Sequence, residues 1–252
     1  DFNRALHRCK IDDVWGIGHR SASKLKAHGI TTALKFTQAD PSWVRRNLSI
    51  TGTRLQKELL CTICSPVNDT SPRKKSIRTA RSFGSEVLSL NVLKESVGTF
   101  AANCAAKLRK EGSHCATITT FVMTNPFKPH APQYSASRNI NLEVPTNDTL
   151  EIVAAALDAL KLIYRDDFAY KKAGVFVRSI TPAVEVQLGL FDVVDRTKRS
   201  SLMGSLDTIN TKLGRDKVRL AVQGFDRKWR LRQERLSPCY TTRFTDFLKV
   251  KI

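Results

Sequence analysis

The sequence predicts an α+β chain of several domains. A small all-helical unit comes first, then a β-α-β-β-α-β unit with a four-stranded antiparallel sheet, and then a C-terminal extension. Three observations predict this order. Apolar residues at helical spacing fill residues 11–67, and strand-like and helical periods alternate over residues 77–180. A short acidic stretch at 182–192 then precedes a basic, aromatic tail at 193–252.

The helical unit covers residues 11–67. Asp40-Pro41 supplies an N-cap followed by proline at the first helical position, so a helix should begin there. Its apolar face consists of Trp43, Val44 and Leu48. A second apolar stripe, which predicts helix up to Ser65-Pro66, consists of Leu55, Leu59, Leu60 and Ile63. Residues 68–76 follow as a polar, basic linker.

Residues 77–181 should form the sheet unit. Strands are predicted at 77–87, 115–123, 137–144 and 173–177, and helices at 93–108 and 153–164. Asn147 or Asp148 caps the second helix. This order places two helices over one face of an antiparallel sheet and leaves the other face free to be solvated or to meet a ligand. In the extension, residues 200–212 predict one helix.

Positive charge dominates the composition. The chain has 42 lysines and arginines against 23 aspartates and glutamates, and its net charge is +19. The excess is spread over every part of the chain except residues 182–192. Dispersed positive charge suits a long polyanion better than it suits a single anionic pocket. The charge therefore favours binding of DNA or RNA, although a ribosomal-type RNA binder or a basic protein without a nucleic-acid role would share it.

The sequence has no mark of a membrane or secretory protein. No stretch approaches ~18 consecutive apolar residues, and no apolar signal region opens the chain. Its six cysteines do not form a disulfide framework, and Cys61 and Cys64 lack the partners of a zinc site. We therefore expect no metal site and a reducing cytoplasmic location. Because a helix-like segment begins directly after Asp1, we also expect the chain to be a fragment.

The strongest motif is Gly16-Ile17-Gly18, which reads as the centre of a helix-hairpin-helix. The two glycines allow a turn so tight that successive backbone N–H groups point outward, and the helix that follows adds its positive end. Those donors can hold a phosphate oxygen without reading bases. Ile17 should pack into the core, and Gly29 should end the helix. The alternative is a plain helical turn whose glycines serve packing.

Two basic residues of the same helix, Arg20 and Lys24, are four positions apart and can reach the same DNA strand. The nearby pair Asp12-Asp13 is explained by helix capping near Val14. A second acidic pair, Asp166-Asp167, lies past a predicted helix end. Two-metal phosphoryl transfer needs carboxylates that converge on ions ~4 Å apart. No such group is evident, so we predict no catalytic residue in this chain.

A basic strand leads into the sheet unit and supplies further candidate DNA-binding residues, Lys74, Lys75, Ser76, Arg78 and Arg81. Alternate residues of a strand share a face, so Arg78 and Arg81 need not point together. The strand's serines, arginines and N–H groups suit phosphate contacts along a duplex. A solvated edge strand protected by its charge would have the same sequence.

The acidic stretch contains the peptide Gln187-Leu188-Gly189-Leu190-Phe191. Exposed leucines and a phenylalanine suit such a peptide if they enter a partner's pocket while Gln187 bonds to its rim. The alternative is a terminal strand whose leucines are buried in the preceding domain.

Three of these motifs, at residues 12–18, 81–84 and 187–191, occur in this order in a known family. Through these motifs the chain resembles the Y-family DNA polymerases of the UmuC type. That group includes the catalytic subunit of DNA polymerase V. Residues 206–210, Gly214-Arg215, Trp229 and 236–243 resemble the C-terminal extension of that group.

The resemblance implies a role for each part of the chain. Residues 1–10 are then a remnant of the palm–thumb junction, 11–67 the thumb, and 77–181 the little finger, whose open sheet enters the DNA major groove. Gln187, Leu188, Leu190 and Phe191 bind the β sliding clamp, with Gly189 in place of a more usual polar residue. Residues 193–252 contact accessory proteins of the SOS response, such as the processed UmuD dimer and RecA, at the nucleoid.

The resemblance also implies what this chain lacks. In the family, a palm N-terminal to the thumb carries the carboxylates that bind Mg²⁺. The parent protein should therefore be a DNA-directed polymerase that copies damaged templates, acting in DNA repair and SOS mutagenesis. This chain alone should be inactive and should hold no cofactor.

Two alternative functions remain open at this point. One is an autonomous, non-catalytic DNA-binding adaptor that recruits the clamp; palm-type motifs encoded before Asp1 would distinguish a polymerase fragment from it. The other is a helix-hairpin-helix glycosylase or nuclease. A glycosylase needs a catalytic Asp or Lys past the hairpin and a base-flipping pocket. Lys24 and Lys26 have no acidic neighbour before Asp40, which weakens that alternative.

Overall fold

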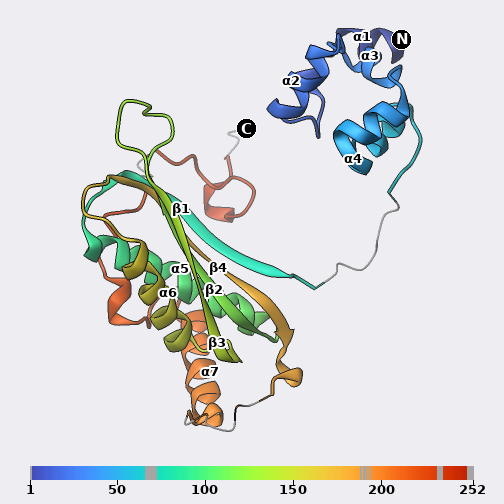
Figure 1. Ribbon diagram of the computed structural model, residues 1–252. Coiled ribbons are helices and arrows are strands. Elements are labelled where there is room, and N and C mark those ends of the chain that lie inside the picture. The colour runs from blue at the N-terminus through green and yellow to red at the C-terminus, as the bar shows by residue number, and fades with distance from the viewer. Residues whose placement is uncertain are drawn as a thin grey trace. The chain divides into compact units, whose positions relative to one another are not determined.

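The computed structural model describes residues 2–65, 73–187, 189, 192, 194–231 and 235–248. The chain divides into two compact units, Asp1–Pro72 and Arg73–Ile252, which we call the helical unit and the sheet unit. The predicted fold class is confirmed: helices come first, then a β-α-β-β-α-β unit, then a further helix (Figure 1).

The helical unit consists of α1 (Phe2–Arg8), a 3-10 turn (Ile11–Asp13), α2 (His19–Ala27), α3 (Ala33–Thr37) and α4 (Pro41–Glu58). Asp40 caps α4 as predicted, because its carboxylate accepts hydrogen bonds from the amides of Ser42 and Trp43 at 3.2 and 3.0 Å. Buried residues of each segment form one small core, with Ile11, Leu25, Phe36 and Val44 at its centre. This core holds the Gly16-Ile17-Gly18 hairpin in place.

The predicted helix up to Ser65-Pro66 is wrong. α4 bends at Ser49 and ends at Glu58. Cys61 has a left-handed φ of 61°, and the amides of Cys61 and Thr62 bond back to the carbonyls of Glu58 and Lys57. These bonds close the helix end as a Schellman motif does. Leu60 and Ile63, part of the predicted stripe, are 54% and 89% exposed. Linker residues 66–72 lie outside the described residues.

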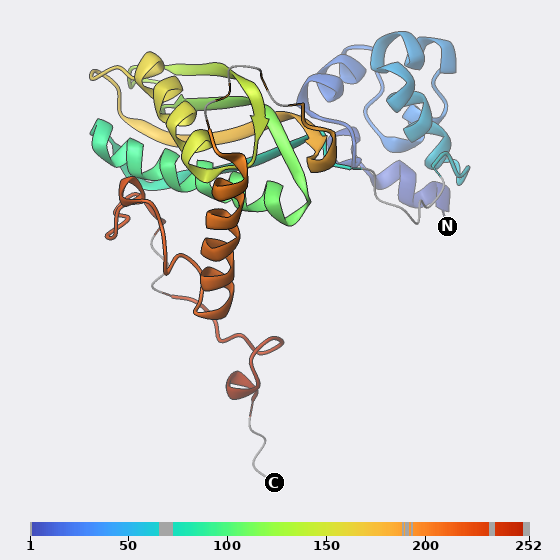
Figure 2. The same cartoon turned by 90° about the horizontal axis from the view of Figure 1, so that it is seen from below.

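The sheet unit has four antiparallel strands in the order β1-β4-β2-β3. They are β1 (Ser76–Val87), β2 (Ser113–Met123), β3 (Ser135–Thr146) and β4 (Tyr170–Pro182). Helices α5 (Leu90–Lys110) and α6 (Thr149–Ile163) lie together on one face of the sheet (Figure 2). Of the two predicted caps of α6, Asp148 is the one used, since its carboxylate accepts from the amide of Leu150 at 2.7 Å.

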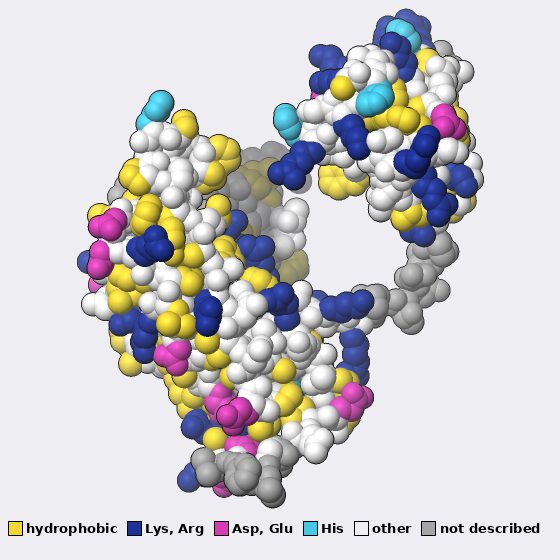
Figure 3. Space-filling view, in the orientation of Figure 1, with side chains coloured by type: hydrophobic (Ala, Val, Ile, Leu, Met, Phe, Trp, Pro, Cys, Tyr) yellow, Lys and Arg dark blue, Asp and Glu magenta, His cyan; other side chains and the backbone are white. Residues whose placement is uncertain are grey.

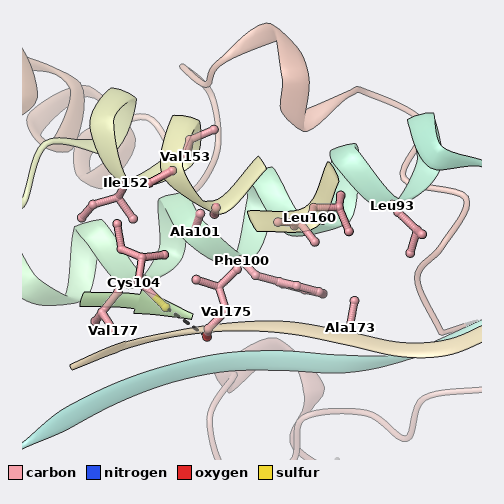
Figure 4. Packing of buried hydrophobic residues seen from close by; sticks show 14 of the residues in the cluster. Leu93, Phe100, Ala101, Cys104, Ile152, Val153, Leu160, Ala173, Val175 and Val177 are labelled. Carbon is pink, nitrogen blue, oxygen red and sulfur yellow. Dashed lines mark hydrogen bonds between the residues drawn. The ribbon is translucent and has the colours of Figure 1, made fainter. Parts of the chain in front are cut away.

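The core of the sheet unit lies between the helices and the sheet (Figure 4). Its central side chains include Leu93, Phe100 and Cys104 from α5, Ile152 and Leu160 from α6, and Val175 and Val177 from β4. Cys104 Sγ lies 3.6 Å from the carbonyl oxygen of Val175. Burial raises the pKa of the Cys104 thiol, and it raises the pKa of the Cys115 thiol to about 12. Both thiols therefore stay protonated and unreactive at neutral pH.

Within the sheet unit, the C-terminal extension packs against α5 and β1. Its helix α7 (Arg196–Lys212) begins before the predicted residue 200, because Asp195 accepts from the amide of Lys198 and caps it. Arg109 of α5 forms two hydrogen bonds to the Asp207 carboxylate, at 2.7 and 2.8 Å. Further on, Trp229 is only 4% exposed, with its ring centroid 5.2 Å from that of Phe100. Two short 3-10 turns, Ala221–Gln223 and Phe244–Asp246, complete the extension.

We expect Trp229→Ala to lower the free energy of unfolding of the sheet unit by about 3–5 kcal/mol, the usual cost of removing a buried large aromatic side chain. Urea unfolding followed by circular dichroism measures this. Phe244 of the same extension is 87% exposed, so Phe244→Ala should change stability by less than about 0.5 kcal/mol. Equal, small effects of both changes would mean that Trp229 does not anchor the extension.

Candidate nucleic-acid interface

The hairpin at residues 14–18 has the shape that its glycines predict. Gly16 has φ +94°, which a residue with a side chain rarely adopts, and the amide of Ile17 bonds to the carbonyl of Val14 at 3.0 Å. The Ile17 side chain is 7% exposed and packs into the core, as predicted. Before the hairpin the structure has a 3-10 turn rather than an α-helix. Trp15, at 95% exposure, stands out from the hairpin; nothing in its sequence context had marked it.

Helix α2 begins directly after the hairpin, and the first backbone amides of the helix are free. Gly18 is the N-cap in extended conformation and provides no side-chain acceptor. The first amides of an α-helix have no partner within the helix, so those of α2 face outward from a positive helix end. A Cβ added at Gly18 would meet no atom within 4 Å. The space beside Gly18, directly before α2, is therefore open.

Arg20 and Lys24 both lie on α2 and are exposed. Neither forms an ion pair with a described residue, so their charges are available to a ligand. The third cation of this helix, Lys26, is paired with Asp12. The predicted capping role of Asp12-Asp13 is therefore wrong, because Asp12 lies in the 3-10 turn and binds across to α2.

A second group of predicted residues lies on β1, an edge strand of the sheet. Ile77 is buried toward the helices, and Ser76 and Arg78 lie on the opposite, open face. Arg81 has the parity of Ile77 and lies on the helix side, so the structure separates it from Arg78. Lys74 is paired with Glu111, and Lys75 is exposed.

The open face carries a polar network that sequence reasoning did not assign. Arg178 of β4 donates from Nη2 to Thr119 Oγ1 and Asn139 Oδ1, both at 3.1 Å. Thr119 itself donates to Asn139 at 2.8 Å. The pairing register also puts Lys172 on this face, opposite Ser82 and Met123. Asn139 alternates with apolar residues along the strand predicted at 137–144, but the register that joins it to Arg178 is a tertiary feature.

Aromatic rings support the two arginines of the open face. The guanidinium carbon of Arg78 lies 4.6 Å from the centroid of the Phe121 ring, and that of Arg178 lies 4.9 Å from the Phe176 ring. The Phe121 ring lies over Gly174, where an added Cβ would come within 2.5 Å of it. Cation–π contacts of this kind restrict the guanidinium groups while their outer N–H donors stay free. Lysine and arginine side chains also lie scattered over each unit (Figure 3).

Of the predicted clamp-binding residues, the structure describes only Gln187, which is exposed. Leu188, Leu190 and Phe191 lie outside the described residues. Directly after the peptide, Asp192 accepts a hydrogen bond from Arg196 at 2.7 Å, which lowers the pKa of that carboxyl. Arg196 also donates to Glu151 of α6 at 2.7 Å. Through Arg196, Asp192 is thereby linked to α6.

Two kinds of feature are absent from the part of the chain that the structure describes. No helix there is both long and apolar enough to cross a membrane. Nor do three or more His, Cys, Asp or Glu side chains come together there in a group that could hold a metal ion.

Residues 74–190 match the impB/mucB/samB family C-terminal domain, and residues 200–250 match a domain of unknown function, DUF4113. Protein ImpB of Salmonella typhimurium is 39% identical over 94% of this chain and 56% of its own length. Protein UmuC of Salmonella typhimurium strain LT2 is 37% identical over 98% of this chain and 59% of its own length. DNA polymerase IV 1 of Mesorhizobium japonicum is 24% identical over 81% of this chain and 45% of its own length.

The chain thus spans less than two thirds of the length of ImpB and UmuC. Protein SamB of Salmonella typhimurium and the MucB proteins are similar to it over almost the same part, at 38% and 37% identity. The matched domain covers every strand of the sheet unit together with α5 and α6. This chain therefore belongs to the UmuC, ImpB, SamB and MucB family, and carries its C-terminal domain.

Proposed function

We propose that this chain is the DNA-binding and clamp-binding part of an error-prone translesion DNA polymerase that acts in SOS DNA repair and mutagenesis. Residues 11–67 act as the thumb and residues 77–181 as the little finger. Residues 182–192 bind the sliding clamp, and residues 193–252 meet further proteins of the damage response, such as the processed UmuD dimer and RecA.

One observation carries the proposal: the four-stranded sheet has helices on one face, while its other face presents Arg78 and Arg178 among neutral hydrogen-bonding side chains. A flat, polar, cationic surface can follow a sugar-phosphate backbone along a groove without reading base sequence. The hairpin before α2 adds a second phosphate-binding element of a different kind, made of backbone amides with Arg20 and Lys24 beside them.

Polymerisation is proposed for the longer protein rather than for these residues. A distant relative bears the name DNA polymerase IV 1, which fits a polymerase as the parent activity. The Mg²⁺-binding carboxylates belong, by the resemblance, to a palm outside this chain. We therefore expect the purified chain to bind primed DNA without extending the primer.

The proposal is tested by measuring the affinity of the purified chain for primed duplex over a range of salt concentrations. Arg20→Ala/Lys24→Ala should weaken binding about tenfold, because each exposed ionic contact contributes up to about 1 kcal/mol. The loss should be equal for unrelated sequences, and the slope of log K against log salt should fall by about 1.8 for two lost phosphate contacts. A loss confined to one sequence would contradict backbone binding.

Two further variants sharpen this test. Gly18→Ala leaves room for its Cβ in the free protein but would crowd a phosphate at the α2 amides, so it should also weaken binding. Arg45→Ala/Arg46→Ala removes the same charge from exposed positions on α4 and should have the smaller effect. If this control lost as much affinity as Arg20→Ala/Lys24→Ala, the hairpin would not be the contact.

A further inference from the structure

A cavity of about 520 Å³ lies between α5, β1 and the C-terminal extension. Its cationic lining comes from four side chains, Arg81, Lys107, Arg215 and Arg230. The other lining side chains include the hydroxyls of Thr79, Ser82 and Thr99. This is where Arg81, separated from Arg78 by the strand's alternation, is located.

The packing of the extension builds this cavity. The amide of Gly84 in β1 donates to the carbonyl oxygen of Trp229 at 3.3 Å, so residue 229 lies directly against the strand. A Cβ on Gly84 would come within 2.6 Å of the Arg230 carbonyl oxygen, so a larger residue would force the two segments apart. Trp229 itself is buried against Phe100. Arg230 is thus brought to the cavity by a firmly anchored neighbour.

Within the described residues, the four cations have neutral partners only. Lys107 Nζ donates to Thr79 Oγ1 at 3.3 Å, and Arg215 Nη2 donates to Asn103 Oδ1 at 2.9 Å. The one carboxylate in the lining, Asp216, is bound to Arg227 at 2.8 Å. Arg227 is itself 6% exposed, and among described residues its Nε and Nη2 find no acceptor.

Among the described residues, this arrangement gathers the four cations around a single carboxylate, Asp216, which is already paired with Arg227. Burial lowers the pKa of Arg230, and the nearby cations Arg227, Arg215 and Arg219 lower it further, although Asp216 acts in the opposite direction. The four cations are exposed but share one cavity. Like charges gathered at one site destabilise one another, and a bound anion would remove that cost. Guanidinium groups hold phosphate oxygens in paired hydrogen bonds, and hydroxyl groups can supply further donors.

We propose that this cavity binds a phosphate group, and so gives the domain of unknown function at residues 200–250 a role in anion recognition. Either a phosphate of a nucleic-acid strand or a free oligophosphate has the required chemistry. The site differs from the proposed duplex-binding surfaces, because neither the hairpin nor the two arginines of the open face, Arg78 and Arg178, line it; of that face only Ser82, at its edge, does so.

Isothermal titration of the full chain with inorganic pyrophosphate tests this site. Saturable binding is expected, and Arg215→Gln/Arg230→Gln should weaken it at least tenfold. Arg81→Gln should weaken it too, and this variant remains informative if the double variant fails to fold, since β1 is held by its pairing with β4. Lys161→Gln, on the exposed side of α6, should bind as the unchanged chain does.

A second arm distinguishes the two sources of phosphate. If a strand phosphate is the ligand, a 5′-phosphorylated single-stranded oligonucleotide should compete with pyrophosphate and lose affinity in the same variants. If a free oligophosphate is the ligand, the oligonucleotide should not compete with pyrophosphate, and its affinity should be the same in these variants. Absence of pyrophosphate binding, or binding that Arg81→Gln and Arg215→Gln/Arg230→Gln leave unchanged, would overturn the proposal even if duplex binding by the chain were demonstrated.

Discussion

Replacing Arg78 and Arg178 by alanine should weaken the binding of primed duplex DNA by about 100-fold at low salt. Each arginine is held by an aromatic ring, and Arg178 is also hydrogen-bonded to Thr119 and Asn139. A charged hydrogen bond from such a restrained donor contributes about 1.5 kcal/mol, and two of them correspond to roughly a hundredfold change in Kd. Fluorescence anisotropy with a labelled primer-template measures the change.

The fold should tolerate this double change. Thr119 and Asn139 remain bonded to each other, and Arg78 is exposed. The matched control is Lys161→Ala/Lys212→Ala, which removes two exposed positive charges from α6 and α7. This control should lower DNA affinity only by reducing long-range electrostatic attraction, and the effect should vanish as the salt concentration is raised. Equal losses of DNA affinity in both double variants would show that binding depends on total charge and not on the open face.

Replacing Leu190 and Phe191 by alanine should abolish capture of the chain by the β sliding clamp. In a peptide that docks into apolar pockets, buried anchors each contribute about 2 kcal/mol or more, so losing two reduces affinity roughly a thousandfold. Gln187→Ala should cost less, because it removes one hydrogen bond at the rim of the pocket. Surface plasmon resonance on immobilised clamp measures all three affinities.

The same variant provides its own specificity control. Leucine and phenylalanine carry no charge, so DNA affinity and its salt dependence should stay within experimental error of the unchanged chain. Capture by the clamp that survives the loss of both side chains would remove residues 182–192 from the proposed interface. It would leave the open face and the hairpin unaffected.

Local chemistry made much of this protein predictable. Asp40-Pro41 marks a helix start because the cap and the fixed proline φ act within one turn, and the structure has both. The two glycines around Ile17 likewise predict a tight turn from backbone freedom alone. Periods of two and 3.6 residues predicted the order of strands and helices, because each period records which side of an element is buried. The family could be identified from the order of three motifs.

Helix ends are less predictable for a physical reason. The apolar stripe that continued to Ile63 satisfied helical spacing, yet the chain leaves the helix at Glu58 through a left-handed Cys61. The bonds that close this end come from its own next residues. A cysteine in that conformation has no sequence signature of the kind that glycine provides.

By itself the sequence determined the elements, their order and their polar faces, because those depend on neighbours within a few residues. Only the tertiary structure decided which distant residues share a surface. Sheet register joined Arg178 to Asn139, and the approach of residues 229–231 to Gly84 turned Arg81 from an edge residue into part of a cationic cavity. The first contact joins residues 39 apart in the sequence and the second joins segments more than a hundred apart, so no local period records either of them.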